Sequence, residues 1–151
     1  MPYVAFGIVT VVVTLGMAIF LLRWLKRLAK NNAQAVRDRY AGRTLHILVE
    51  NVNFFGQQSL GVTQGRGNGT LAVAEDEIYF LRWLPQKEFV VPLRDIESVE
   101  IVKSFLGKTR FTPLLKITFR SASGTSDAMA WHVGDAYNLK EQLEERISAQ
   151  R

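Results

Sequence analysis

Two glycine-containing segments carry residue types that can bind phosphate. Gly107-Lys108-Thr109 is similar to the end of a P-loop, but that motif needs a further glycine five residues before Gly107, where Val102 stands. It also needs a helix next, whereas Phe111-Thr112-Pro113 follows. Gly65-Arg66-Gly67-Asn68-Gly69 leads into an expected strand, whereas a dinucleotide fingerprint follows a strand and opens a helix. We therefore interpret the first segment as a turn and the second as a flexible loop.

Side chains with acid–base, metal or nucleophile chemistry are few and scattered. The absence of Cys from the sequence excludes a thiol nucleophile, a Cys-based zinc site and a disulfide scaffold. His46 and His132 each lie in an expected strand, without a second ligand at metal spacing. Glu75-Asp76-Glu77 has oxygen ligands for calcium, but it is more typical of a solvated hairpin turn. With no nucleophile elbow present, we expect no catalytic site, metal, cofactor or small-molecule substrate.

The positive net charge is confined to the N-terminal quarter of the chain. Residues 1–39 contain six basic side chains and one acidic side chain, 6 − 1 = +5, which equals the net charge of the whole protein. Residues 40–151 contain 13 basic and 13 acidic side chains, 13 − 13 = 0. A nucleic-acid-binding domain carries its own basic surface. We therefore expect no nucleic-acid partner and interpret the charge as a membrane topology signal.

The N-terminal segment has the length and composition of a membrane-spanning helix. Tyr3 to Leu22 is an uncharged run of 20 residues, and a helix of that length spans ~30 Å, the hydrocarbon thickness of a bilayer. A cleaved signal peptide would have a basic start and a small-residue cleavage site, and the run has neither. Basic residues directly after the run favour a cytoplasmic C-terminal side. These juxtamembrane residues are Arg23, Lys26, Arg27 and Lys30, with Trp24 placed for an aromatic interface belt.

This pattern predicts a single-pass protein of the plasma (cytoplasmic) membrane with three parts. Residues 1–30 form the transmembrane anchor and its basic end, residues 31–44 a linker, and residues 45–151 a cytoplasmic domain. Asn31 and Asn32 are poor helix formers and favour a break in the helix there. Residues 33–40 are then either a polar linker or a last helical piece.

From Leu45 onward the hydrophobic pattern changes from helical to alternating, which predicts a mainly β domain. Asp135 is placed to cap a C-terminal helix, because apolar residues follow it at spacings of three and four. We expect Trp131, on the last strand, and Leu143, on this helix, to pack together in the core. The expected strands lie near residues 45–50, 70–74, 77–84, 88–91, 96–103, 115–120 and 129–133, and the helical stripe is Ala136, Leu139, Leu143 and Ile147.

About seven antiparallel strands followed by one amphipathic helix resemble the pleckstrin-homology-like (PH-like) superfold, including its GRAM and bacterial PH-like domains. The likeness covers residues 45–148 and is carried by Gly69–Val73, Glu77–Phe80 and Val91–Val99. It implies a bent sheet or barrel capped by the C-terminal helix. Phosphoinositide-binding PH domains carry a basic cluster mainly in the first inter-strand loop, but here that loop, residues 54–69, holds only Arg66. Inositide binding is therefore not expected.

The best candidate for a binding surface is the segment from Lys103 to Phe111, where three cations interleave with apolar residues. Such a loop could contact anionic lipid or an acidic protein. The alternative is an ordinary hairpin whose apolar residues pack back onto the core. The predicted contact residues are Lys103, Phe105, Leu106, Lys108 and Arg110.

The function that these patterns favour is that of a non-enzymatic, membrane-tethered interaction module. Its PH-like domain would bind a protein partner or anionic lipid close to the bilayer. The alternative is an accessory subunit of a larger membrane protein complex, whose helix packs against other helices. A small enzyme is the least supported hypothesis.

Overall fold

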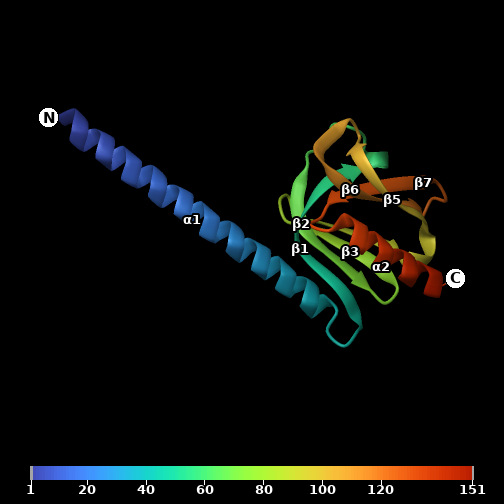
Figure 1. Ribbon diagram of the computed structural model, residues 1–151. Helices are drawn as coiled ribbons and strands as arrows, with labels where there is room; N and C mark the ends of the chain where they lie inside the picture. The colour runs from blue at the N-terminus through green and yellow to red at the C-terminus, as the bar shows by residue number, and fades with distance from the viewer. Residues whose placement is uncertain (1, 151) are drawn as a thin grey trace.

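A long N-terminal helix, a curled antiparallel sheet and a C-terminal helix make up the structure, a computed structural model that describes residues 2–150 and the side chains of residues 6–150 (Figure 1). Helix α1 (Pro2–Arg39) is uninterrupted over 38 residues. By length and composition it could cross a membrane, and no other helix among the described residues could. Its two threonines are compatible with an apolar medium, because the hydroxyls of Thr10 and Thr14 donate to the carbonyls of Phe6 and Thr10 at 2.9 and 2.5 Å.

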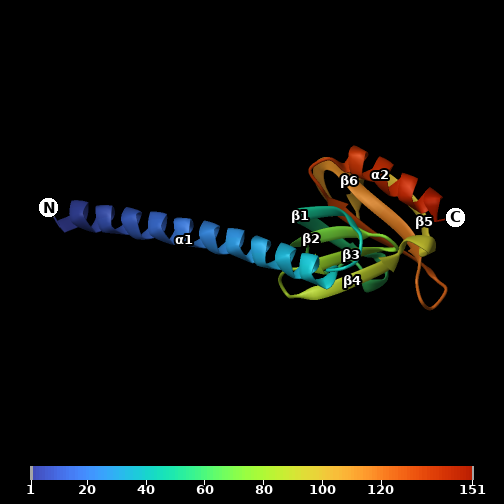
Figure 2. The ribbon, with the colours of Figure 1, turned by 90° about the horizontal axis from the view of Figure 1, so that it is seen from below.

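Seven strands form one sheet in the order β4-β3-β2-β1-β7-β6-β5, with every neighbouring pair antiparallel. This confirms the predicted mainly β class and the expected strand number. Figure 2 shows the sheet curling between α1 on one side and helix α2 on the other. The strands are β1 (Leu45–Gln57), β2 (Gly67–Ala74), β3 (Glu77–Arg82), β4 (Lys87–Pro92), β5 (Ile96–Phe105), β6 (Lys108–Arg120) and β7 (Ser126–His132).

Strand β1 joins the two halves of the curled sheet. Its first part pairs with β2, from Leu45 opposite Ala74 to Phe54 opposite Gly67, and its last part pairs with β7. The register with β2 shifts between Val49 and Val52, where Asn51 adopts a left-handed backbone conformation with φ 64°. Bulges of this kind bend a strand and increase its twist. The bend allows one strand to serve both halves.

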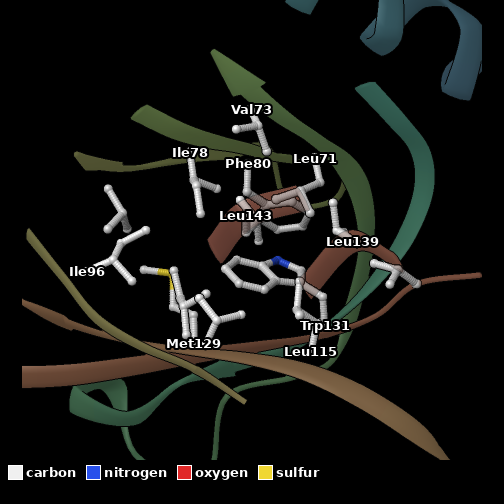
Figure 3. Close-up of a cluster of buried hydrophobic side chains, with 14 of the residues drawn as sticks. Leu71, Val73, Ile78, Phe80, Ile96, Leu115, Met129, Trp131, Leu139 and Leu143 are labelled. Atoms are coloured by element: carbon white, nitrogen blue, oxygen red, sulfur yellow. The ribbon is translucent and has the colours of Figure 1, made fainter. Parts of the chain in front are cut away.

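The core fills the space between the sheet and α2 (Ala136–Ala149) (Figure 3). Trp131 and Leu143 are each 1% exposed, which confirms their predicted core positions. The Trp131 ring lies 5.9 Å from that of Phe54 and 5.8 Å from that of Phe80, centroid to centroid. Asp135 caps α2 as predicted, since its carboxylate accepts from the Asn138 N–H at 3.0 Å. All four residues of the predicted apolar stripe of α2 are buried.

The flexible loop predicted at residues 65–69 is wrong in part, because β2 already begins at Gly67, and the β1–β2 connection before it contains regular structure. A short 3-10 helix, η1 (Gln58–Leu60), follows β1, and the buried carboxylate of Asp127 holds it. That carboxylate accepts from the Ser59 N–H at 2.9 Å, the Ser59 hydroxyl at 2.6 Å and the Gln57 side chain at 2.5 Å. Burial alone would raise the pKa of Asp127, but these hydrogen bonds hold it below its ordinary value.

The break expected at Asn31 and Asn32 is wrong, because α1 passes through both residues and ends at Arg39. The Asn32 side chain donates to the Leu28 carbonyl at 2.7 Å and is itself buried. Of the two readings of residues 33–40, the last helical piece is right. We name residues 32–40 the docked segment, because Val36 and Tyr40 pack on the outer face of β2 and β3. This tertiary contact outweighs the low helix propensity of two asparagines, each a few tenths of a kcal/mol.

Candidate functional site

The predicted contact segment forms the hairpin between β5 and β6, at the top of the domain in Figure 1. Phe105 pairs with Lys108 across a two-residue turn, Leu106-Gly107, in which both residues have positive φ (51° and 71°). Short hairpins favour such turns because their twist matches that of the strands. The interpretation of this segment as a turn is confirmed, since Gly107 is one of the two turn residues.

The apolar residues at this turn are directed toward the domain. Phe105 is 8% exposed and packs with Phe55, Leu114, Ala128 and Ala130, while Leu106 packs against the same cluster and is half-buried. The predicted role of Phe105 as a contact residue therefore has no support in this structure. The cause is strand alternation, because the side of β5 that carries Phe105 faces the second half of the sheet.

The three predicted cations of the hairpin have different surroundings. Lys103 and Arg110 are exposed, whereas Lys108 is half-buried and its ammonium donates to the Gln64 carbonyl at 2.5 Å. The Arg66 guanidinium donates to the Thr109 carbonyl at 3.4 Å, so the hairpin and the β1–β2 loop lie against each other. Two exposed cations, Lys103 and Arg110, rather than three, are therefore available to a partner.

A large bulge in β6 follows the hairpin turn. Ser104 pairs with Thr109 and Val102 with Leu114, so that Lys103 alone stands opposite the four residues 110–113. Phe111, in the bulge, has a φ of 58° and a side chain that is 95% exposed. The Thr109 hydroxyl fixes this shape, donating to the Lys103 carbonyl at 2.7 Å and accepting from the Phe111 N–H at 3.1 Å.

Phe111 borders a groove of about 550 Å³ between the bulge and the start of α2, which we name the Phe111 groove. Tyr137, 64% exposed, stands on its α2 side. Sequence reasoning missed Tyr137 and Pro113 as parts of this surface. Pro113 inside a strand was the available signal, because proline within a sheet marks an edge or a bulge. The groove is lined by Ile101, Lys103, Thr109, Phe111, Thr112, Pro113 and Tyr137.

His132, at the end of β7, lies within the electrostatic reach of this bulge. Partial burial, and then the positive charge of Arg110, lower the pKa of His132 below its ordinary value. Both effects favour the uncharged form of the imidazole. Among residues 2–150 there is no group of three or more metal-ligating side chains. In the acidic turn, the Asp76 carboxylate accepts a hydrogen bond from the Arg43 guanidinium at 2.5 Å. The Glu77 carboxylate accepts one from the Tyr40 hydroxyl at 2.6 Å.

The predicted juxtamembrane residues lie on α1 at the other side of the molecule, two to nine residues before the docked segment. Trp24 is 43% exposed. Within the described chain, the four cations of this segment form no hydrogen bond or ion pair. They are Arg23, Lys26, Arg27 and Lys30. The structure thus does not bring them together with the hairpin cations, and the two groups are separate candidate surfaces.

Comparison with solved structures identifies the architecture. The Vps36 N-terminal PH domain is 16% identical over 72% of this chain and 82% of its own, with a TM-score of 0.50. The domain has a PH-like fold. The C-terminal domain of an unknown protein from Leishmania infantum is also 16% identical, over 77% of this chain and 98% of its own, with a TM-score of 0.52. A chain of the 8S snRNP assembly intermediate is 9% identical over 70% and 80%, with a TM-score of 0.50.

These likenesses confirm the resemblance that the strand pattern carried, and at such identities they establish the PH-like fold alone. No model of a protein family and no curated protein matches the sequence. What the PH-like domain binds must therefore be argued from its own surface.

Proposed function

We propose that this protein is a non-enzymatic binding module held at the plasma membrane by one transmembrane helix. Residues 1–30 are its anchor and residues 45–151 its PH-like domain, on the cytoplasmic side. Residues 31–44 connect the two, largely as the docked segment of α1. The arginine- and lysine-rich end of the anchor supports this orientation, because such residues are retained in the cytoplasm.

The observation that carries the proposal is the exposure of Phe111. Burying a phenylalanine side chain is worth about 1.5–3 kcal/mol, and a bulky residue at positive φ costs on the order of 1–3 kcal/mol. Phe111 carries both costs, because its side chain is exposed and its φ is positive. Two hydrogen bonds of the Thr109 hydroxyl hold this conformation. A partner that covers Phe111 would recover the burial term. Aromatic side chains beside a groove are typical anchors of protein interfaces.

The chemistry of the groove indicates the kind of partner. Its lining is mainly apolar and includes Ile101, Pro113 and Tyr137. Lys103 is its one charged lining residue, and Arg110 lies in the same bulge. We therefore expect a protein segment that inserts an apolar side chain beside Phe111 and places a carboxylate near Lys103.

The test replaces Phe111 with a photo-crosslinking phenylalanine analogue in the full chain, in its own membranes. We expect a protein adduct of one discrete mass on irradiation, and no such adduct from the same analogue at Ala122, which is exposed on the β6–β7 turn. Lys103→Glu should abolish the adduct, whereas Arg94→Glu should not, although Arg94 is also an exposed cation. Adducts with lipid alone, or adducts unaffected by Lys103→Glu, would rule out this protein-binding surface.

A further inference from the structure

A second groove lies where α1 leaves the domain, far from Phe111. Leu22, Leu25, Lys26 and Ala29 of the helix form one wall, and the opposite wall comes from three strands or their ends: Asn51, Asn68 and Trp83. Its volume is about 190 Å³. A neighbouring hollow of about 370 Å³ continues along the same helix and shares Lys26 and Ala29 with it. We name the first of these the juxtamembrane groove.

The depth of this groove follows from the proposed membrane span. Leu22 is the last residue of the uncharged run, so it lies at the edge of the hydrocarbon if α1 crosses the bilayer. Lys26 is four residues further along, about 6 Å along the helix axis, which is the level of the lipid head groups. Figures 1 and 2 both show the N-terminal half of α1 extending away from the domain. On the proposed span, the groove therefore lies at the level of the head-group layer.

The polar groups of the groove are mostly hydrogen-bond donors without a protein acceptor. Lys26 has no hydrogen bond or ion pair among the described residues. Asn68 accepts from Asn53 at 2.8 Å through its carbonyl oxygen, which leaves its amino group to donate. Asn51 is exposed, and the bulge in β1 holds it in place.

A carboxylate beside this site, that of Glu50, already has a basic partner. Glu50 lines the neighbouring hollow, but the Arg37 guanidinium donates to it at 2.9 Å. The apolar part of the groove is formed by Leu22 and Leu25 with the buried Trp83. The Trp83 indole N–H donates to the Thr70 hydroxyl at 3.0 Å. A cation and two amides at one end and aliphatic side chains at the other match the two ends of a phospholipid.

We propose that the juxtamembrane groove binds one anionic phospholipid of the cytoplasmic leaflet. Its phosphate accepts from Lys26 and from the amides of Asn51 and Asn68, and its acyl chain follows Leu22 and Leu25. The site exists only because the docked segment holds α1 against the sheet, so it is a product of the two parts together. The inference rests on the proposed membrane span, and it is independent of the protein partner at Phe111.

The test uses the full chain purified in detergent and titrated with phosphatidylglycerol or phosphatidylcholine, followed by native mass spectrometry. We expect one retained phosphatidylglycerol and weaker retention of phosphatidylcholine. Lys26→Gln should reduce phosphatidylglycerol retention about fivefold, the effect of one basic residue near anionic lipid. The matched control is Arg23→Gln, which removes the same charge from the same helix outside the groove and should have a much smaller effect.

Several outcomes would overturn the proposal. Equal loss in Lys26→Gln and Arg23→Gln would mean diffuse attraction without a site, and no preference for phosphatidylglycerol would mean no anion recognition. Displacement by millimolar inorganic phosphate would show that the groove binds the anion and not the lipid. Release of the full chain from membranes by alkaline carbonate would overturn the proposed span itself, so the two failures are distinguishable. Unchanged thermal unfolding of both variants controls for folding.

Discussion

Two stretches of α1, both basic and both helical, have opposite surroundings. The juxtamembrane segment, residues 23–30, has four cations that make no ion pair in the described part of the chain. At the docked segment and just after it, Arg37, Arg39 and Arg43 meet Glu50, Glu88 and Asp76 at 2.9, 3.3 and 2.5 Å. The difference arises from the apolar residues at positions 33, 36 and 40, which form a stripe at spacings of three and four. Charge alone therefore does not tell which part of a basic helix forms ion pairs with a domain and which does not.

The most drastic way to break this comparison is to place the domain on the wrong side of the membrane. A reporter fused after Arg151 should be active if it works in the cytoplasm and silent if it works outside, an all-or-none result. Reversing Arg23, Lys26, Arg27 and Lys30 to Glu should reduce the cytoplasmic signal, because these cations set the orientation. Strong activity of an external reporter on the unaltered chain would contradict the proposed topology.

A substitution in the hydrophobic core should have the next largest effect, and it is measured as a change in the free energy of unfolding. Leu143→Ala leaves a cavity between α2 and the sheet and should lower the free energy of unfolding by about 2–5 kcal/mol. Chemical denaturation of the full chain in detergent, followed by tryptophan fluorescence, measures it. The exposed Leu84, on the β3–β4 turn, provides the control, and Leu84→Ala should change little. A loss below about 1 kcal/mol for Leu143→Ala would argue against the packing of α2 on the sheet.

Removing the central contact of the docked segment should have an intermediate effect. Tyr40→Ala deletes a buried ring that lies 5.9 Å from Tyr79 and a hydroxyl that donates to Glu77 at 2.6 Å. We expect a loss of about 2–4 kcal/mol, against about 1 kcal/mol for Tyr40→Phe. Hydrogen exchange of residues 32–40 should speed up strongly in Tyr40→Ala. Exchange that stays at the wild-type rate would mean that the docked segment does not need this contact.

Alkaline pH should weaken the same docking. Burial, then the hydrogen bond to Glu77, raise the pKa of Tyr40 above 10.0, and burial with the charge of Glu88 raises the pKa of Tyr79 to about 12. An undocked tyrosine ionises near pH 10, so docking is fully stable below that pH and weakens above it, by up to ~1.4 kcal/mol per unit and group. In a phenolate absorbance titration, Tyr40→Phe should remove a late-titrating group. Loss of a group with ordinary pKa would contradict this.

The smallest effect sharpens the comparison most directly. Arg37→Gln removes an exposed ion pair with Glu50 and should cost roughly 0.2–1 kcal/mol of unfolding free energy. Lys26→Gln removes a cation without a protein partner and should cost nothing in detergent without anionic lipid. Adding phosphatidylglycerol should stabilise wild type and Arg37→Gln but much less Lys26→Gln. Equal stabilisation of all three would remove the distinction between the two stretches.

Periodicity predicted most of the fold but little of the candidate site. Alternation placed all seven strands, and the residues after Asp135 placed α2 and its buried stripe, because these are local patterns. The burial of Phe105 depends on which side of β5 meets the rest of the sheet, and the exposure of Phe111 depends on a register shift opposite Lys103. Neither property can be predicted from a window of ten residues. The docking of residues 32–40 was missed because a short apolar stripe beside two asparagines is a weak local signal. Its partners, on β2 and β3, are distant in the sequence.

Because α1 is one uninterrupted helix, it limits the motions by which the domain can meet a partner. If residues 31–44 were a flexible chain of 14 residues, the domain could wander ~20 Å from its anchor point and tumble freely. A helix fixed to the sheet instead leaves only rotation about its own axis and tilting of the whole protein. If α1 spans a membrane as proposed, rotation about its axis carries the Phe111 groove on a circle at one height above the membrane plane, and only tilting of the whole protein changes that height. Partners carried in the same membrane, with their binding segment at that height, would meet it by lateral diffusion, whereas a segment at another height would pass without contact.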